Sequence, residues 1–314
     1  MNYADFTRKL ADSVQGRLGE SREADLRAVI TDNQVSRTGI AITAAGSEET
    51  KIVPRIFLES YYEQYKAGRT VRELTDSFLH DYEACSVNIG IISGNFREFS
   101  RVQDSIRLRI INAEKNSDLL KEMPHRRFLD LAVTCYYSPD AAGFENGRIN
   151  VSTEDLEDWE ISEEELFEIA EQNMRNYEPP VVRPLAEIVE EMGAGPAEPD
   201  LKERNVPSAF PAPLYVITGK SAYHGAVYMA DPSVTAGLAC KLGCDYYLLP
   251  SSVHEVIALP ALSTANARDL NELVAGINMA VVPETQVLAD HCYFYSMEEG
   301  VILDGRDCVP ACEE

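Results

Sequence analysis

The stretch YYLLPSSVHEVIALP, residues 246–260, contributes most to our interpretation of the fold. An apolar run at 246–249 is followed by Pro250 and two serines, and a second apolar run at 253–259 contains several β-branched residues. Short runs of this composition on either side of a turn are typical of consecutive strands in one sheet. We therefore expect two strands that are joined at the serines.

The sequence around this strand pair predicts an α+β arrangement for the C-terminal part of the chain. The expected elements are a hairpin formed by 214–218 and 223–229, a helix from the N-cap Asp231 to Gly243, a helix at 268–280, and strands at 287–296 and 301–303. With the central pair, their order is ββαββαββ, which favours a mainly antiparallel sheet.

The N-terminal part is predicted to be richer in helix. Apolar residues recur every fourth position from Phe6 to Leu18, and Thr70 with Glu73 has the spacing of a capping box. Further elements are expected as a hairpin of 39–42 and 51–54, a helix at 57–66, strands at 106–110, 128–137 and 148–151, and a helix that begins after Ser162. The prediction is a helix-rich lobe with a small mixed sheet.

An acidic region and a proline-rich segment separate these two parts. Residues 151–200 contain 16 acidic and two basic side chains, and eight prolines fall within 179–213. Such a proline-rich stretch is typical of a stiff, irregular connector. We predict an N-terminal lobe at 1–178, a linker at 179–213 and a C-terminal lobe at 214–314.

Composition argues against several classes of partner. With 52 acidic and 28 basic side chains the net charge is −24, which disfavours nucleic acid and anionic membranes. Charged residues interrupt the apolar pattern near the N-terminus, and seven cysteines are spread along the chain. We expect a cytoplasmic protein, with an unknown protein or small molecule as its partner.

The central strand pair also contains the candidate site. Ser251, Ser252, His254 and Glu255 interrupt the apolar pattern, and Asp290 is an acid that the fold could bring near them. A serine hydrolase needs a nucleophile, a base and an acid, and these residue types supply them, but the Gly-x-Ser-x-Gly motif is absent. Structural turn and cap roles for the two serines fit the same pattern.

Metal binding is a second interpretation of this segment. His254-Glu255 matches the first half of His-Glu-x-x-His, but Ala258 stands where the second histidine would be. A site would have to recruit His224, His291 or Cys292 through the fold, and the pairs Cys240/Cys244 and Cys308/Cys312 share a spacing that zinc can use. No nucleotide-binding glycine motif occurs, so the sequence predicts no cofactor.

Several segments resemble a bacterial domain-of-unknown-function family, number 5688. They are residues 61–68, 128–133, 223–226, 249–256 and 278–288. Residues 155–166 are similar to a related uncharacterised family of Gram-positive bacteria. The resemblance implies a bacterial protein and transfers no catalytic role to any position.

These observations favour a non-catalytic binding or regulatory module whose ligand lies near residues 251–255 and Asp290. The alternative is a hydrolase that is either metal-dependent or serine-based and is centred on the same turn. A third possibility is an interaction protein that captures a basic partner through the acidic helix at 154–171.

Overall fold

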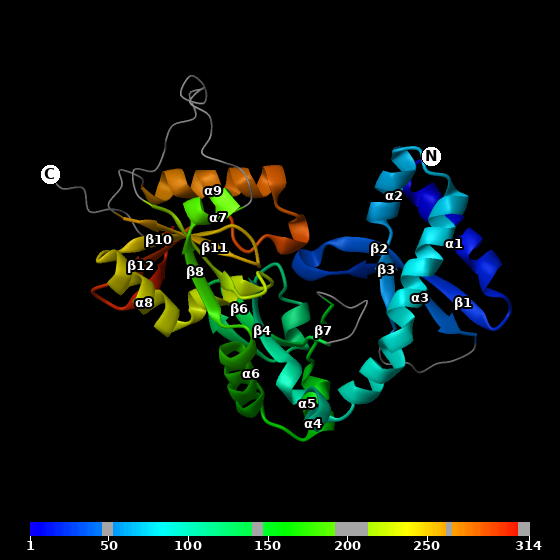
Figure 1. Cartoon of the computed structure of the whole chain (residues 1–314), viewed down its shortest axis with the longest axis horizontal. Helices are drawn as coiled ribbons and strands as arrows, with labels where there is room; N and C mark the ends of the chain where they lie inside the picture. Colours follow the sequence, from blue (N-terminus) through cyan, green and yellow to red (C-terminus); the bar gives the residue numbers. More distant parts are fainter. Residues whose placement is uncertain (46–52, 140–146, 192–212, 262–265, 307–314) are drawn as a thin grey trace.

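Three antiparallel sheets, each formed by one part of the chain, organise the molecule (Figure 1). The computed structural model describes residues 1–45, 53–139, 147–191, 213–261 and 266–306. Every strand pair in the three sheets is antiparallel. The predicted α+β class is confirmed.

The first sheet and three helices form the N-terminal part. Its elements are α1 (Tyr3–Leu18), β1 (Arg22–Ile30), η1 (Asp32–Gln34), β2 (Ser36–Ala44), β3 (Arg55–Phe57), α2 (Glu59–Lys66) and α3 (Val71–Phe96). The fourfold spacing of Phe6, Leu10 and Val14 places all three on the buried face of α1, in a core that also contains Phe78. The Thr70 capping box starts α3 as predicted, but β1, whose side chains are mostly exposed, was not expected.

The second sheet has β6 at its centre. Its elements are α4 (Phe99–Val102), η2 (Gln103–Ser105), β4 (Ile106–Asn112), η3 (Leu119–Lys121), β5 (His125–Phe128), β6 (Leu131–Tyr137), β7 (Ile149–Asn150), α5 (Thr153–Trp159) and α6 (Glu163–Tyr177). All seven residues of β6 are buried, because α6 packs against the β4–β6 pair. Ser162 caps α6 by accepting a hydrogen bond from the Glu165 backbone N–H.

The third sheet has the order β13-β12-β10-β11-β9-β8. Its elements are β8 (Pro180–Pro184), α7 (Leu185–Glu191), β9 (Tyr215–Gly219), η5 (Gly225–Ala230), α8 (Pro232–Leu242), β10 (Tyr246–Pro250), β11 (Val256–Pro260), α9 (Ala267–Val281), η6 (Glu284–Gln286), β12 (Tyr293–Ser296) and β13 (Val301–Asp304). In Figure 1, α9 and α8 lie on opposite sides of this sheet.

The apolar run at 246–249 is explained by burial on both faces of the third sheet. Tyr246 and Leu248 belong to the largest core, together with residues of α8 and of the second sheet. Tyr247 and Leu249 point the other way, into a smaller core that includes α9. Because successive side chains of a strand face opposite sides, a strand covered on both sides has to be apolar throughout.

The predicted hairpin at 214–229 is wrong in its second arm. The chain turns through left-handed backbone at Ala222 and His224, and residues 225–230 form a 3-10 helix instead of a strand. Gly225 then lies against β9, where a Cβ atom would be 2.1 Å from the backbone nitrogen of Gly219. Two other strands are shorter than predicted, since β11 begins at Val256 and β12 at Tyr293.

The segment predicted as an irregular linker contributes structure to the third sheet. Residues 180–184 form β8, an edge strand, and this position suits prolines, which lack a backbone donor. The largest core combines residues from α3, the second sheet and the third sheet, so residues before position 192 and residues after position 212 share one core. The division into two lobes stays a prediction. None of the helices in the described ranges has the length and hydropathy needed to cross a bilayer.

Candidate functional site

The turn between β1 and β2 inserts into the C-terminal part of the molecule. Asn33, whose φ is 59°, donates hydrogen bonds from its side-chain nitrogen to the carbonyls of Glu284 at 2.8 Å and Val287 at 2.7 Å. Its side-chain oxygen accepts from Asn116 of the second sheet's region at 2.8 Å. This docking brings the neighbouring Asp32 against Arg109 on β4 and Arg148 just before β7.

Asp32 is part of a group that we call the junction cluster: Asp32, Arg109, Arg148, His224 and His254. The Asp32 carboxylate accepts two hydrogen bonds from Arg109, at 2.8 and 3.3 Å, and one from Arg148. Arg109 is completely buried on β4, and Asp32 is 8% exposed. Two guanidinium groups therefore share one carboxylate in the interior.

Charge interactions keep Asp32 ionised. Burial alone would raise the pKa of its carboxyl, but the charges and hydrogen bonds of Arg109 and Arg148 lower the pKa below its usual value. Arginine stays protonated in proteins. The three charged groups thus leave one positive charge in excess.

The hydrogen bonds around the two histidines assign their tautomers. The His224 backbone N–H donates to Nδ1 of His254 at 3.1 Å, so a neutral His254 carries its proton on Nε2. Arg148 lies 3.3 Å from Nε2 of His224 and can only donate, so the proton of His224 is on Nδ1.

Both imidazoles are held in the neutral form. Burial lowers the pKa of His224, and the positive charges of Arg148 and Arg109 lower it further. Burial and Arg148 also lower the pKa of His254. The histidines consequently add hydrogen-bonding groups to the cluster without adding charge.

The junction cluster forms one wall of a cavity of about 470 Å³. The cavity is lined by Asp32, Arg148, His224 and His254 of the cluster and by Ile30, Thr31, Arg37, Phe57, Leu119, Asn150, Tyr223, Val253, Thr285 and Gln286. The ring of Tyr223 stacks on His254 with centroids 4.9 Å apart. Two lining atoms, Nδ1 of His224 and Oδ1 of Asn150, are buried without a hydrogen-bond partner among the described residues.

Of the predicted site residues Ser251, Ser252, His254 and Glu255, His254 alone lines this cavity. Ser252 accepts a hydrogen bond from the His254 backbone N–H at 3.0 Å, and the Ser251 hydroxyl donates to Glu255 at 3.4 Å. Because Nδ1 of His254 accepts from His224, neither serine is hydrogen-bonded to that nitrogen. The two serines and Glu255 hold the turn before β11.

The other predicted site residues lie elsewhere. Asp290 accepts hydrogen bonds from Asn278 at 2.8 Å and from Lys115 at 3.2 Å. Burial alone would raise the pKa of the Asp290 carboxyl, but these two bonds lower the pKa below its usual value. Cys292 is buried in the core under α9.

The predicted set of metal ligands is therefore divided. His224 and His254 have ring centroids 5.3 Å apart, while His291 faces Asp130 and Asp304 instead. At the paired histidines, the neighbouring guanidinium groups oppose a metal cation.

Asp32, Arg109 and Arg148 were not predicted as site residues from the sequence. Arg109 alternates with apolar residues on β4, and this pattern predicts an exposed side chain. In the folded protein, however, the face of β4 that carries Arg109 is covered by the β1–β2 turn, which is distant in sequence. A polar turn at residues 31–33 was the one visible signal, and such turns are common on surfaces.

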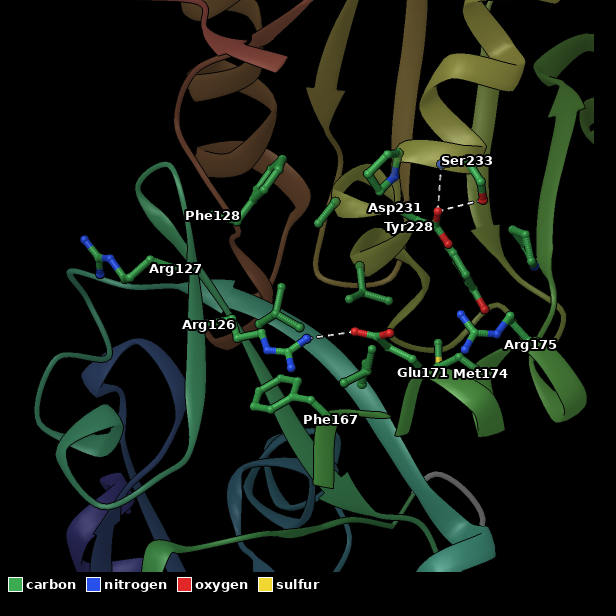
Figure 2. Close-up of a pocket in the computed structure, with 16 residues that line it drawn as sticks. Arg126, Arg127, Phe128, Phe167, Glu171, Met174, Arg175, Tyr228, Asp231 and Ser233 are labelled. Carbon is green, nitrogen blue, oxygen red and sulfur yellow. Dashed lines mark hydrogen bonds and ion pairs between the residues drawn. The ribbon is translucent and has the colours of Figure 1, made fainter. Parts of the chain in front are cut away.

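A second cavity, of about 740 Å³, lies between the second sheet, α6 and the η5–α8 segment (Figure 2). Two of its charged side chains pair with each other, since Arg126 lies 2.8 Å from Glu171, and Arg126 also lies over the ring of Phe167. Asp231 caps α8 by accepting from Ser233. This cavity is larger and more apolar than the one beside the junction cluster.

The fold and the junction cluster define an α+β protein with a buried, positively charged centre between three sheets. The chain belongs to the family described as a family of unknown function (DUF5688), whose model matches residues 3–297. The resemblance to this family is confirmed, and the similarity of residues 155–166 to a second uncharacterised family stays a prediction. Neither the curated proteins nor the solved structures contain a significant match.

Proposed function

We propose that this chain is a binding protein for a small anionic ligand, which occupies the cavity beside the junction cluster. The ligand carries a phosphate or carboxylate group that contacts Arg148. This proposal involves no covalent chemistry on the protein. It rests on the excess of one positive charge in the cluster.

An unbalanced buried charge is costly, because the interior solvates it less well than water does. Among the described residues that line the cavity, Asp32 is the one carboxylate, and it already accepts hydrogen bonds from both Arg109 and Arg148. Arg148 is the accessible member, since its side chain is 28% exposed. An anion in the cavity would complete the charge balance from the solvent side.

The neutral groups of the wall suit the same kind of ligand. His224 presents a buried Nδ1–H that has no acceptor in the part of the chain that the structure describes, and Nε2 of His254 is protonated as well. Tyr223, stacked on His254, supplies an aromatic surface for the rest of the ligand. Oδ1 of Asn150, which has no donor among residues 1–45, 53–139, 147–191, 213–261 and 266–306, favours a ligand that also carries a donor such as a hydroxyl.

The test compares inorganic phosphate with malonate in thermal unfolding of the full chain, with potassium chloride at matched ionic strength as the reference. We expect one of these anions to raise the Tm saturably, since a ligand at 100 times its Kd stabilises by about 2.7 kcal/mol. Arg148→Gln should abolish the shift. This variant leaves Asp32 and Arg109 as a balanced pair, so the protein should still fold.

Arg101→Gln is the matched control, because Arg101 is an exposed arginine paired with Glu98 on α4. It should keep the wild-type response to the anion. Equal Tm values in phosphate, malonate and chloride would refute the proposal, as would an unchanged response of the Arg148 variant.

A further inference from the structure

A second charged group, which we call the acidic cluster, consists of Asp130, His291, Asp304 and Arg306. Asp130 lies in the turn between β5 and β6, His291 precedes β12, and Asp304 ends β13. One ligand atom from each of Asp130, His291 and Asp304 can be chosen so that all three lie within 4.8 Å of one another. The cluster therefore joins an edge of the third sheet to the second sheet.

His291 is aimed at the two carboxylates without being hydrogen-bonded to them. Its side chain is 7% exposed, and its Nε2 lies 3.5 Å from Asp130 Oδ2 and 3.6 Å from Asp304 Oδ1. This buried nitrogen has no hydrogen-bond partner among the residues that the structure describes. Charge-assisted hydrogen bonds are much shorter, about 2.7–2.9 Å.

The same separations suit two atoms that share a metal ion. Zinc binds histidine nitrogen and carboxylate oxygen at about 2.0–2.2 Å, and tetrahedral geometry then places neighbouring ligand atoms about 3.4 Å apart. The distances from His291 to both carboxylate oxygens are close to this value. One nitrogen and two carboxylate oxygens would leave the fourth position to water.

The surroundings orient the carboxylates. The Tyr293 hydroxyl donates to Asp130 Oδ1 at 2.8 Å, which leaves Oδ2 facing His291. The Arg306 backbone N–H donates to Asp304 Oδ1 at 2.8 Å, and the Arg306 guanidinium contacts both carboxylates. Such outer contacts fix the positions of metal ligands.

We propose that the acidic cluster binds one divalent transition-metal ion such as Zn²⁺ through Asp130, His291 and Asp304, in exchange for the guanidinium of Arg306. Two carboxylates outnumber the single arginine, so a divalent ion balances the charge better than the guanidinium does. The Arg306 side chain is 54% exposed and can move into solvent. The ion would fasten β13 to the β5–β6 turn.

The test measures Zn²⁺ binding to the chelator-treated full chain by equilibrium dialysis. The wild type should bind one equivalent that His291→Gln and Asp130→Asn lose. Tyr293→Phe should raise the Kd by roughly 10- to 100-fold, because Tyr293 is a positioning residue. Arg306→Gln should lower the Kd, and this gain cannot arise from misfolding.

Two controls separate this site from adventitious binding. His125→Gln removes a histidine on β5 outside the cluster, and Cys308→Ser removes a thiol that could hold zinc. Both should retain the equivalent of zinc, and Co²⁺ bound to the wild type should give a visible spectrum of tetrahedral type without a thiolate band. A wild type that binds no zinc, or binding that persists unchanged in His291→Gln, overturns the proposal.

Discussion

The junction cluster and the acidic cluster use the same residue types in opposite proportions. The junction cluster has two arginines for one aspartate, and the acidic cluster has two aspartates for one arginine. Each contains a histidine with a buried nitrogen that has no partner among the described residues. They differ in depth as well, because Arg109 is fully buried and the Arg306 side chain is half exposed.

This contrast shows that charge proportion and depth, more than residue type, decide what a cluster can bind. Excess guanidinium at the junction favours an anion, and excess carboxylate at β13 favours a cation. The two clusters also differ in their relation to the family, since the match ends at residue 297 and Asp304 and Arg306 follow it. A property shared across the family is therefore expected at the junction cluster first.

The largest effect is expected for Asp32→Asn. This change leaves the buried guanidinium of Arg109 without its carboxylate, and breaking a buried pair in this way costs about 3–5 kcal/mol. The free energy of unfolding, measured by urea denaturation, should fall by that amount. Adding Arg148→Gln should restore part of the loss, because only one unpaired guanidinium would then remain.

Asp118→Asn provides the control for this comparison. Asp118 forms an ion pair with Lys121 on the surface, with both side chains more than 70% exposed. Its replacement should leave the free energy of unfolding unchanged within error. A loss in Asp32→Asn no larger than in this control would show that the junction pair is not a buried one.

Tyr293→Phe is the corresponding change at the acidic cluster. It removes the hydroxyl that donates to the ionised Asp130, and hydrogen bonds to charged groups contribute about 1.5–3 kcal/mol. Measured without metal, the loss in the free energy of unfolding should be smaller than for Asp32→Asn. A larger loss than for Asp32→Asn would show that the acidic cluster contributes more to the free energy of unfolding than the junction cluster does.

The histidine of the junction cluster should make stability depend on pH. The pKa of His224 in the folded protein lies below its usual value of 6.5, so below pH 6.5 the unfolded state binds a proton that the folded state does not. Above pH 6.5 His224 therefore does not lower the free energy of unfolding. Below pH 6.5 it lowers the free energy of unfolding by about 1.4 kcal/mol for each pH unit.

His224→Asn should reduce this dependence, and asparagine tolerates the left-handed backbone at this position. Urea denaturation at pH 7, 6 and 5 measures the slope. His80→Asn, at an exposed position of α3, should keep the wild-type slope. Identical slopes in both variants would contradict a buried neutral His224.

The sequence predicts the parts of this molecule that depend on local signals. The apolar run at 246–249 and the caps at Thr70 and Ser162 gave correct elements, because strand alternation and helix capping involve near neighbours. The 3-10 helix at 225–230 escaped prediction because its conformation depends on close packing against β9.

The candidate site was only partly predictable for the same reason. His254 could be singled out as a polar residue in an apolar run. Arg109 could not, because it is 77 positions from Asp32 and its strand pattern resembles that of a sheet with one exposed face. The charge balance of the junction therefore emerges only when the three sheets are assembled.

The smallest effect is expected for Arg306→Gln in the absence of metal. Arg306 pairs with Asp304 and Asp130 from a half-exposed position, where solvent weakens ion pairs to about 1 kcal/mol or less. Urea denaturation should detect little change, although Arg306 makes more charged contacts than Arg109 does. A loss comparable to that of Asp32→Asn would mean that Arg306 is an integral part of the core and cannot give way to a metal ion. A small loss, combined with tighter zinc binding, would show that depth decides which arginine of the two clusters is replaceable.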